Sequence, residues 1–152
     1  MLLAEALAHR ADLNARTSQL AARAVANARL QEGDSPVEDP TALLAEHDRL
    51  AAELADLVAA INRTNLAIEV SPGTTMTAAL ARRDQLRAVH RVRTNVADAA
   101  SQRHDRLTRS EVKPVPAVDV AAVRQAADDA ARELREIDIR IQEVNWTSQL
   151  LQ

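Results

Sequence analysis

The sequence contains no cysteine, no phenylalanine and no tyrosine, and it has only two glycines among 152 residues. Without cysteine the chain has no disulfides, no zinc–thiolate or iron–sulfur centre and no catalytic thiol. Two glycines are too few for a glycine-rich phosphate loop. Trp146 is the only aromatic residue, so the chain offers no set of rings for stacking nucleic-acid bases. These absences exclude several common classes of catalytic and binding site.

Long hydrophobic runs are also missing. No apolar stretch approaches the roughly 20 residues that span a bilayer. The N-terminal stretch MLLAEALAHRADL carries Glu5 within its apolar part and has no basic leader, so it predicts the start of an amphipathic helix rather than a signal peptide. We therefore expect a soluble, cytoplasmic protein without a membrane partner.

The residues that are abundant favour helix. Alanine, leucine, arginine, glutamate and aspartate dominate, and these side chains lose little rotamer freedom on a helix. A β-rich fold would need more β-branched and aromatic residues. The length predicts one domain of moderate core size, covering residues 1–152.

Charge is distributed unevenly along the chain. Residues 81–113 carry nine basic and four acidic residues, a net +5, whereas the rest of the chain is −8. Such a basic segment could bind a small anion, or it could pair with acids of the same molecule or of a neighbour. The sequence pI of about 5.8 and the lack of a helix-turn-helix spacing argue against nucleic acid as a partner.

Four helical segments are expected, joined by recognisable turns. Gly33 is a candidate cap for the first, Asp39 followed by Pro40 begins the second, and Thr77 caps the third. The turn Ser71-Pro72-Gly73-Thr74 predicts a small β-hairpin near 66–77. The expected helices cover roughly residues 2–30, 40–65, 78–100 and 120–144, and a long loop occupies 102–118.

Two of these helices carry strict heptad seams. The second has Leu43, His47, Leu50, Leu54, Leu57 and Ile61, and the fourth has Val120, Val123, Ala127, Ala130, Leu134, Ile137, Ile141 and Val144. The alternating spacing of three and four is that of a coiled coil. We expect an all-α, antiparallel four-helix bundle in which these two seams face each other. With few large side chains to bury, the chain is expected to form a homo-oligomer.

Candidate metal and catalytic residues lack a recognised spacing. His47 lies on the seam of the second helix, where it is either a hydrogen-bonded boundary residue or a ligand or pH switch. The Glu-x-x-His pairs of di-iron bundles are absent. The loop RHDRLTRSEVK holds residue types used in acid–base or phosphate chemistry, but also those of a salt-bridged structural loop. We predict no metal and no cofactor.

The stretch INRTN ends the seam of the second helix with polar residues. Continuing the heptad places Thr64 in the next seam position, and Asn62 and Asn65 share a face. Asn145 follows the last seam residue of the fourth helix in the same way. One interpretation is that these asparagines satisfy backbone groups at two helix ends and set the register. The other is that both ends meet, with Trp146, in one polar pocket.

Several stretches together resemble the septicolysin-like family of small bacterial proteins. They are EALAHRADL, QEGDSPVEDP, INRTN, ALARRDQLR, DRLTRSEVK and NWTSQLL, which occur in this order along the whole chain. The resemblance implies an all-helical, cytoplasmic protein of unknown biochemical function, and the family name implies a cytolysin. Positions that look like the family's motifs are Asn62, Arg63, Thr64, Asn65, Arg83, Asp84, Arg109, Ser110, Glu111, Lys113, Asn145 and Trp146.

The leading hypothesis from the sequence is a non-enzymatic helical protein that assembles with itself through its seams and through charge-complementary faces. One alternative is a protein, enzymatic or not, that binds a small anionic ligand at the ends of the second and fourth helices. A second alternative is the cytolysin that the family name implies. The candidate ligand-binding residues are Asn62, Arg63, Asn65, Arg109, Ser110, Glu111, Lys113, Asn145 and Trp146.

Overall fold

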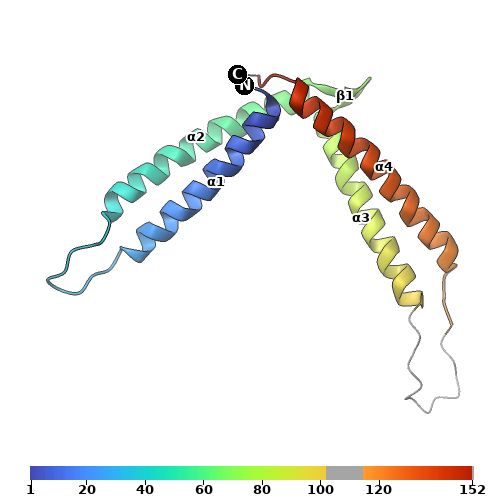
Figure 1. Cartoon of the computed structure of the whole chain (residues 1–152), viewed down its shortest axis with the longest axis horizontal. Helices are drawn as coiled ribbons and strands as arrows, with labels where there is room; N and C mark the ends of the chain where they lie inside the picture. Colours follow the sequence, from blue (N-terminus) through green and yellow to red (C-terminus); the bar gives the residue numbers. More distant parts are fainter. Residues whose placement is uncertain (102–114, 152) are drawn as a thin grey trace, which may run out of the picture. The chain divides into compact units, whose positions relative to one another are not determined.

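The computed structural model describes residues 1–101 and 115–151. These residues are mostly helical, with one short pair of strands, which confirms the predicted helical class and the small hairpin (Figure 1). The elements are α1 (Leu3–Ala26), α2 (Pro40–Ala67), β1 (Glu69–Ser71), β2 (Thr74–Thr75), α3 (Met76–Ser101) and α4 (Val120–Thr147). Most of the loop predicted at 102–118 lies outside the described residues.

The chain divides into two compact units. Unit 1 comprises Met1–Glu69 together with Glu143–Gln152, and unit 2 comprises Val70–Gln142. Unit 1 contains α1, α2 and the last turn of α4, whereas unit 2 contains α3 and most of α4. A single domain over residues 1–152 and the arrangement of four helices in one bundle both stay predictions.

In unit 1, α1 begins and ends through local hydrogen bonds. The Glu5 carboxylate accepts from the Leu2 N–H at 2.7 Å, which stabilises the first turn. The helix was expected to reach residue 30 and to be capped by Gly33, but it ends at Ala26. Both the backbone N–H and the side-chain amide of Asn27 donate to the Arg23 carbonyl, at 3.1 and 3.0 Å, and so close the helix early. Gly33, with φ of +96°, lies in the linker.

The second helix begins as predicted. The Asp39 side chain accepts from the Thr41 N–H at 2.9 Å, and Pro40 occupies the first helical position. The seam residues Leu43, Leu50 and Leu57 are buried. Each such side chain contributes roughly 1.5–3 kcal/mol when fully removed from water.

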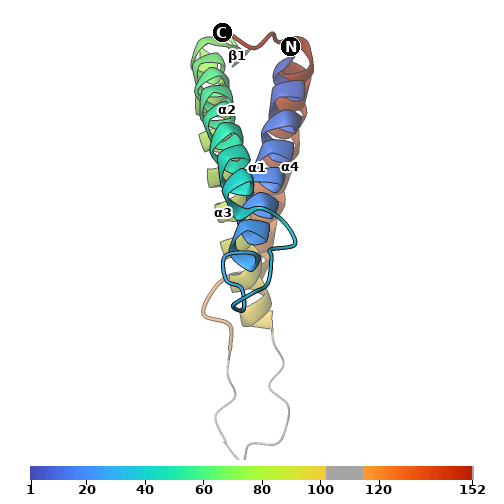
Figure 2. The same ribbon diagram turned by 90° about the vertical axis from the view of Figure 1, so that its left-hand side faces the viewer.

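The partner of this seam is α1. The two helices of unit 1 pack along their length (Figures 1 and 2). The buried residues of α1 are Leu3, Ala6, Leu13, Leu20 and Ala24. The apolar stripe of α1, imperfect as it is, therefore covers the seam of α2. The expectation that the seams of the second and fourth helices face each other stays a prediction.

The hairpin connects α2 to α3 over only a few residues. Gly73, with φ of +76°, occupies the left-handed position of the turn between β1 and β2, as the Pro-Gly pair predicts. The third helix begins at Met76, two residues before the expected start. Thr75, not Thr77, provides the cap, since its hydroxyl accepts from the Ala78 N–H at 3.3 Å.

In unit 2, α3 and α4 are close enough for side chains of one to reach the backbone of the other. His90 Nδ1 lies 3.1 Å from the Ala127 carbonyl, and Arg93 donates to the Ala126 carbonyl at 2.8 Å. Ala127 and Ala130 are both buried, each about 4% exposed. Small residues at these seam positions allow this close approach of the two helices.

Candidate functional site

The polar motif at the end of α2 lies where the two ends of the chain meet in unit 1. We call this region the terminal junction: residues 1–3, Thr64 and residues 148–151. The Leu3 N–H donates to the Ser148 carbonyl and the Leu150 N–H to the Met1 carbonyl, both at 2.9 Å. These bonds flank an antiparallel bridge between Leu2 and Gln149. The two ends of the chain consequently lie next to each other (Figure 1), and the last residues lie beside the C-terminal end of α2.

Thr64 connects the end of α2 to the C-terminal segment. It occupies the seam position that the heptad predicts, and it is fully buried. Its hydroxyl donates to the Ala60 carbonyl at 2.8 Å and accepts from the Leu151 N–H at 2.9 Å. Both hydrogen-bonding capacities of the hydroxyl are thus used inside the protein. Thr64 therefore acts as a structural tie between residues 87 positions apart.

The predicted site residues near the junction differ in exposure. Asn145 is buried, Asn65 is half-buried, and Asn62 and Arg63 are exposed. The Trp146 side chain is 62% exposed. The segment after α4 reaches the end of α2, where the Leu151 N–H donates to the Thr64 hydroxyl. A ligand-binding site at this place stays a prediction. The motif residue that sequence reasoning omitted from the site, Thr64, is the one with the most specific contacts.

The remaining predicted site residues are Arg109, Ser110, Glu111 and Lys113, and they lie outside the described residues. The motif positions Arg83 and Asp84 are adjacent in α3 and pair with each other at 3.2 Å. Arg83 also reaches within 4.0 Å of the Asp138 carboxylate on α4. This pair belongs to unit 2, whereas the terminal junction belongs to unit 1.

Other arginines at the start of α3 are neutralised within unit 2. Arg82 forms an ion pair with Glu133 at 2.7 Å, and Arg87 lies 3.5 Å from Asp138. The basic segment was expected either to bind an anion or to pair with acidic residues. Arg82, Arg83 and Arg87 pair with carboxylates of unit 2, as the second interpretation predicts. Guanidinium groups already facing carboxylates attract a further anion weakly.

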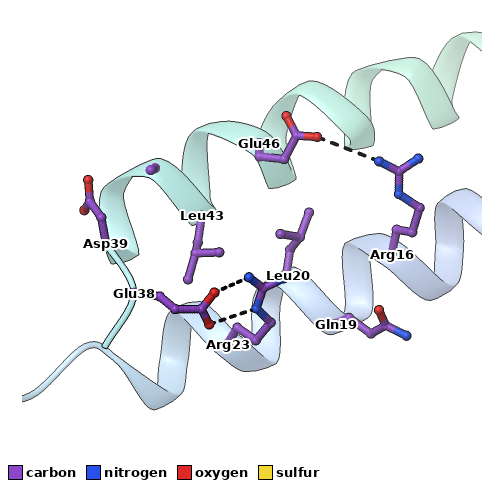
Figure 3. Close-up of a pocket in the computed structure, with 9 residues that line it drawn as sticks. Arg16, Gln19, Leu20, Arg23, Glu38, Asp39, Leu43 and Glu46 are labelled. Atoms are coloured by element: carbon purple, nitrogen blue, oxygen red, sulfur yellow. Dashed lines mark hydrogen bonds and ion pairs between the residues drawn. The ribbon is translucent and has the colours of Figure 1, made fainter. Parts of the chain in front are cut away.

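A charged groove lies between α1 and α2 at the end nearest their linker (Figure 3). Its volume is about 600 Å³. Arg23 forms a two-pronged ion pair with Glu38 of the linker, with Nε 2.9 Å from Oε2, and Arg16 lies 3.9 Å from Glu46. The lining residues are Arg16, Gln19, Leu20, Arg23, Glu38, Asp39, Ala42, Leu43 and Glu46.

The ion pairs shift the acid–base equilibria of the groove. The hydrogen bond from Arg23 lowers the pKa of Glu38 below its ordinary value of 4.5, and the same contact raises the pKa of Arg23. Hydrogen bonding from Arg49 likewise lowers the pKa of Glu46. The groove therefore contains carboxylates and guanidiniums that satisfy one another, an arrangement suited to fixing the linker on the helices.

Sequence reasoning did not identify this groove. Arg23 lies on α1 and Glu38 lies fifteen positions later, near the end of the linker, and neither is among the candidate site residues. The acidic linker QEGDSPVEDP was the only available signal, and it gives no indication of which arginine Glu38 meets.

Histidines and acids do not gather into a metal site in the part of the chain that the structure describes. His47 is half-buried, and its Nδ1 lies 3.0 Å from the Asp48 carboxylate. His9 and Glu53 form a pair between α1 and α2 at 3.1 Å. No helix in residues 1–101 and 115–151 is long and apolar enough to cross a membrane.

These features define a class of protein: mostly helical, with two pairs of long helices, a short β-hairpin and a junction that ties the chain ends together. The chain belongs to a family of unknown function, DUF6847, whose model matches residues 10–150. The family description does not carry the septicolysin name, so that resemblance stays a prediction.

A solved structure is similar to the chain over its whole length. It is the crystal structure of a functionally unknown conserved protein from Corynebacterium diphtheriae, 42% identical, with 99% of each chain covered and a TM-score of 0.93. None of the curated proteins compared with the chain matches it.

Proposed function

We propose that this protein is a non-enzymatic, cytoplasmic helical protein that assembles with copies of itself. The observation that carries this proposal is the incomplete burial of the heptad seams. Leu54 of α2 and Leu134 and Ile137 of α4 occupy seam positions and remain half-buried. Seam positions of a stable coiled coil are normally packed between helices, so these residues favour a further helical partner.

Two of these three half-buried residues, Leu134 and Ile137, belong to unit 2. In the described part of unit 2 the buried residues are Met76, Ala79, Leu86, Ala97, Ala127, Ala130 and Ile141, of which four are alanines. A unit of this size rarely gains more than a few kcal/mol from a single core, and this core contains few large side chains. Covering the half-buried aliphatic residues with a second chain would add the apolar area that the unit itself does not bury.

Sedimentation velocity over a range of micromolar concentrations tests the proposal. We expect a dimer or larger species, and a monomer throughout would overturn the proposal. Ile137→Ala should shift the equilibrium toward monomer, because it removes seam area. Ile139→Ala on the same helix is the matched control, since Ile139 is 68% exposed and lies off the seam. Equal effects of both variants would show that the seam does not contribute.

The alternative functions predict different measurements. A small-anion-binding protein should gain thermal stability with phosphate or nucleotides. A cytolysin should release dye from liposomes. The paired state of Arg16, Arg23, Arg82 and Arg87 supports neither, because their charge is already balanced by carboxylates. We therefore expect no thermal shift and no leakage, and a reproducible effect in either assay would replace self-assembly as the preferred function.

A further inference from the structure

The side of α2 that faces away from α1 carries an unexpected pattern. We call it the outer face of α2. It runs opposite the buried seam, and its residues follow one another at spacings of three and four, which place them on one side of a helix. The outer face comprises Leu44, Asp48, Ala52, Ala55, Ala59, Asn62 and Leu66, all exposed. Leu44 and Leu66 are 52% and 65% exposed.

The end positions of the outer face are symmetric about Ala55, whereas Ala52 and Ala59 lie three and four positions from it. Leu44 and Leu66 each lie eleven positions from Ala55, and Asp48 and Asn62 each lie seven positions from it. When two copies of this helix lie antiparallel about a two-fold axis at Ala55, Leu44 of each copy lies against Leu66 of the other. A two-fold interface requires a patch that complements itself in this way. The alanines between the ends allow the two backbones to approach closely.

Asp48 on the outer face and Arg63 beside it carry opposite charges at the two ends of the proposed contact. In the antiparallel pairing, Asp48 of one copy faces Asn62 of the other and lies beside Arg63. The Asp48 side chain is 80% exposed, and among residues 1–101 and 115–151 its ion-pair partner is its sequence neighbour His47. Arg63 is exposed, and within the described part of the chain it forms no ion pair. The symmetry would thus create two Asp48–Arg63 pairs, one at each end of the contact.

We propose that the outer face of α2 is a contact between two copies of this chain, arranged antiparallel with Ala55 on the two-fold axis. This inference rests on the proposed self-assembly and adds to it, because it uses the side of α2 opposite the half-buried seam. The helix is already formed and packed against α1, so little conformational entropy would be lost on association. The charge complementarity selects a second copy over an unrelated partner.

A cysteine cross-link tests the geometry, since the natural chain contains no cysteine. Ala55→Cys places a thiol on the two-fold axis, where Cα atoms of two copies can reach the range of about 4.4–6.8 Å that a disulfide needs. We expect mild oxidation to convert Ala55→Cys into a covalent dimer at least about tenfold faster than Ala15→Cys, because only the first thiol faces its own copy. Ala15 is an equally exposed alanine, on α1.

Charge reversal tests the same contact independently. Asp48→Arg and Arg63→Asp should each weaken association about tenfold, because each sets like charges together across the interface. The combination of both substitutions should restore association, since the pairs re-form with opposite sign. All these positions are exposed, and circular dichroism checks that each variant keeps its helical content.

The outcomes separate this inference from the proposed function. A monomer at all concentrations would overturn both. Self-association without preferential cross-linking through Ala55→Cys, and without rescue in the doubly reversed variant, would overturn the contact through α2 and leave self-assembly standing. Preferential cross-linking together with rescue would establish the contact.

Discussion

The two units contain similar pairs of long helices but hold them together differently. Unit 1 packs large aliphatic side chains, with Leu13, Leu50 and Ile61 each at most 1% exposed. Unit 2 packs mainly alanines, and its helices are linked by hydrogen bonds and ion pairs from α3 to α4, such as those of Arg82 and His90. The comparison shows that two pairs of similarly long helices can be stabilised in different ways. One pair buries large apolar side chains, and the other packs closely through alanines and adds hydrogen bonds and ion pairs between its helices.

The two units also differ in net charge. Unit 1 has six arginines against twelve acids, a net −6, whereas unit 2 has thirteen basic residues against ten acids, a net +3. In unit 1, charge pairs lie along the linker groove, and in unit 2 they bridge the two helices. Substitutions in each core and in each set of polar contacts can therefore test the comparison.

The largest effect is expected in the core of unit 1. Leu50→Ala should lower the free energy of unfolding by about 2–5 kcal/mol, because the removed side chain is buried between α1 and α2 and leaves a cavity. Urea denaturation, monitored by circular dichroism and by Trp146 fluorescence, measures this change in the free energy of unfolding. Leu30→Ala is the control, since Leu30 is 52% exposed. Similar small losses for both variants would contradict an aliphatic core in unit 1.

The corresponding change in unit 2 adds volume instead of removing it. Ala127→Leu should lower the free energy of unfolding by about 1–3 kcal/mol, because the site is buried against the close approach of α3. Ala121→Leu, at an exposed position of α4, provides the control. Hydrogen exchange of α3 and α4 reports the effect locally. If Ala127→Leu stabilised the protein, the core of unit 2 would not be closely packed.

The terminal junction should respond to loss of a single hydroxyl. Thr64→Val keeps the shape of the side chain but leaves the Leu151 N–H without its acceptor, at a cost of about 1–3 kcal/mol. Amide exchange at Leu151 should accelerate, while exchange in unit 2 stays unchanged. Thr147→Val is matched to it, because that exposed hydroxyl bonds only to carbonyls of its own helix. Unchanged exchange at Leu151 would argue against the tie.

The smallest effect concerns pH and is specific to the groove of unit 1. Because folding lowers the pKa of Glu38 and Glu46, their ion pairs stabilise the folded state above pH 4.5. That contribution disappears as pH falls through the lowered pKa values. The variant carrying Glu38→Gln and Glu46→Gln should show a flatter decline of melting temperature between pH 6 and pH 3 than the natural chain. If the melting temperature of the variant and of the natural chain fell equally with pH, these ion pairs would not contribute to stability.

Local signals predicted some boundaries well and others poorly. The start of α2 at Asp39-Pro40 and the turn at Gly73 depend on the backbone of a few residues, so the sequence was sufficient. The end of α1 was missed because Asn27, an ordinary helix residue in the pattern, closes the helix with its side chain. Such side-chain competition for a carbonyl depends on a conformation that spacing alone does not show.

The site was predicted only in part for a related reason. The heptad correctly placed Thr64 on the seam, but the bond to Leu151 joins opposite ends of the chain. The asparagines were expected at two helix ends because they follow the last seam residues, and of these Asn145 is buried whereas Asn62 is exposed. The groove joins Arg23 to Glu38 across the linker, and no periodicity links those two positions.

The sequence by itself determined the helical class, the seams and the hairpin turn, because propensity, heptad spacing and turn chemistry act over a few neighbouring residues. Only the tertiary structure decided that α1 covers the seam of α2, and that a buried threonine ties the last residues to that helix. An apolar stripe indicates that a helix face is covered, whereas the choice of what covers it depends on how distant segments meet in space.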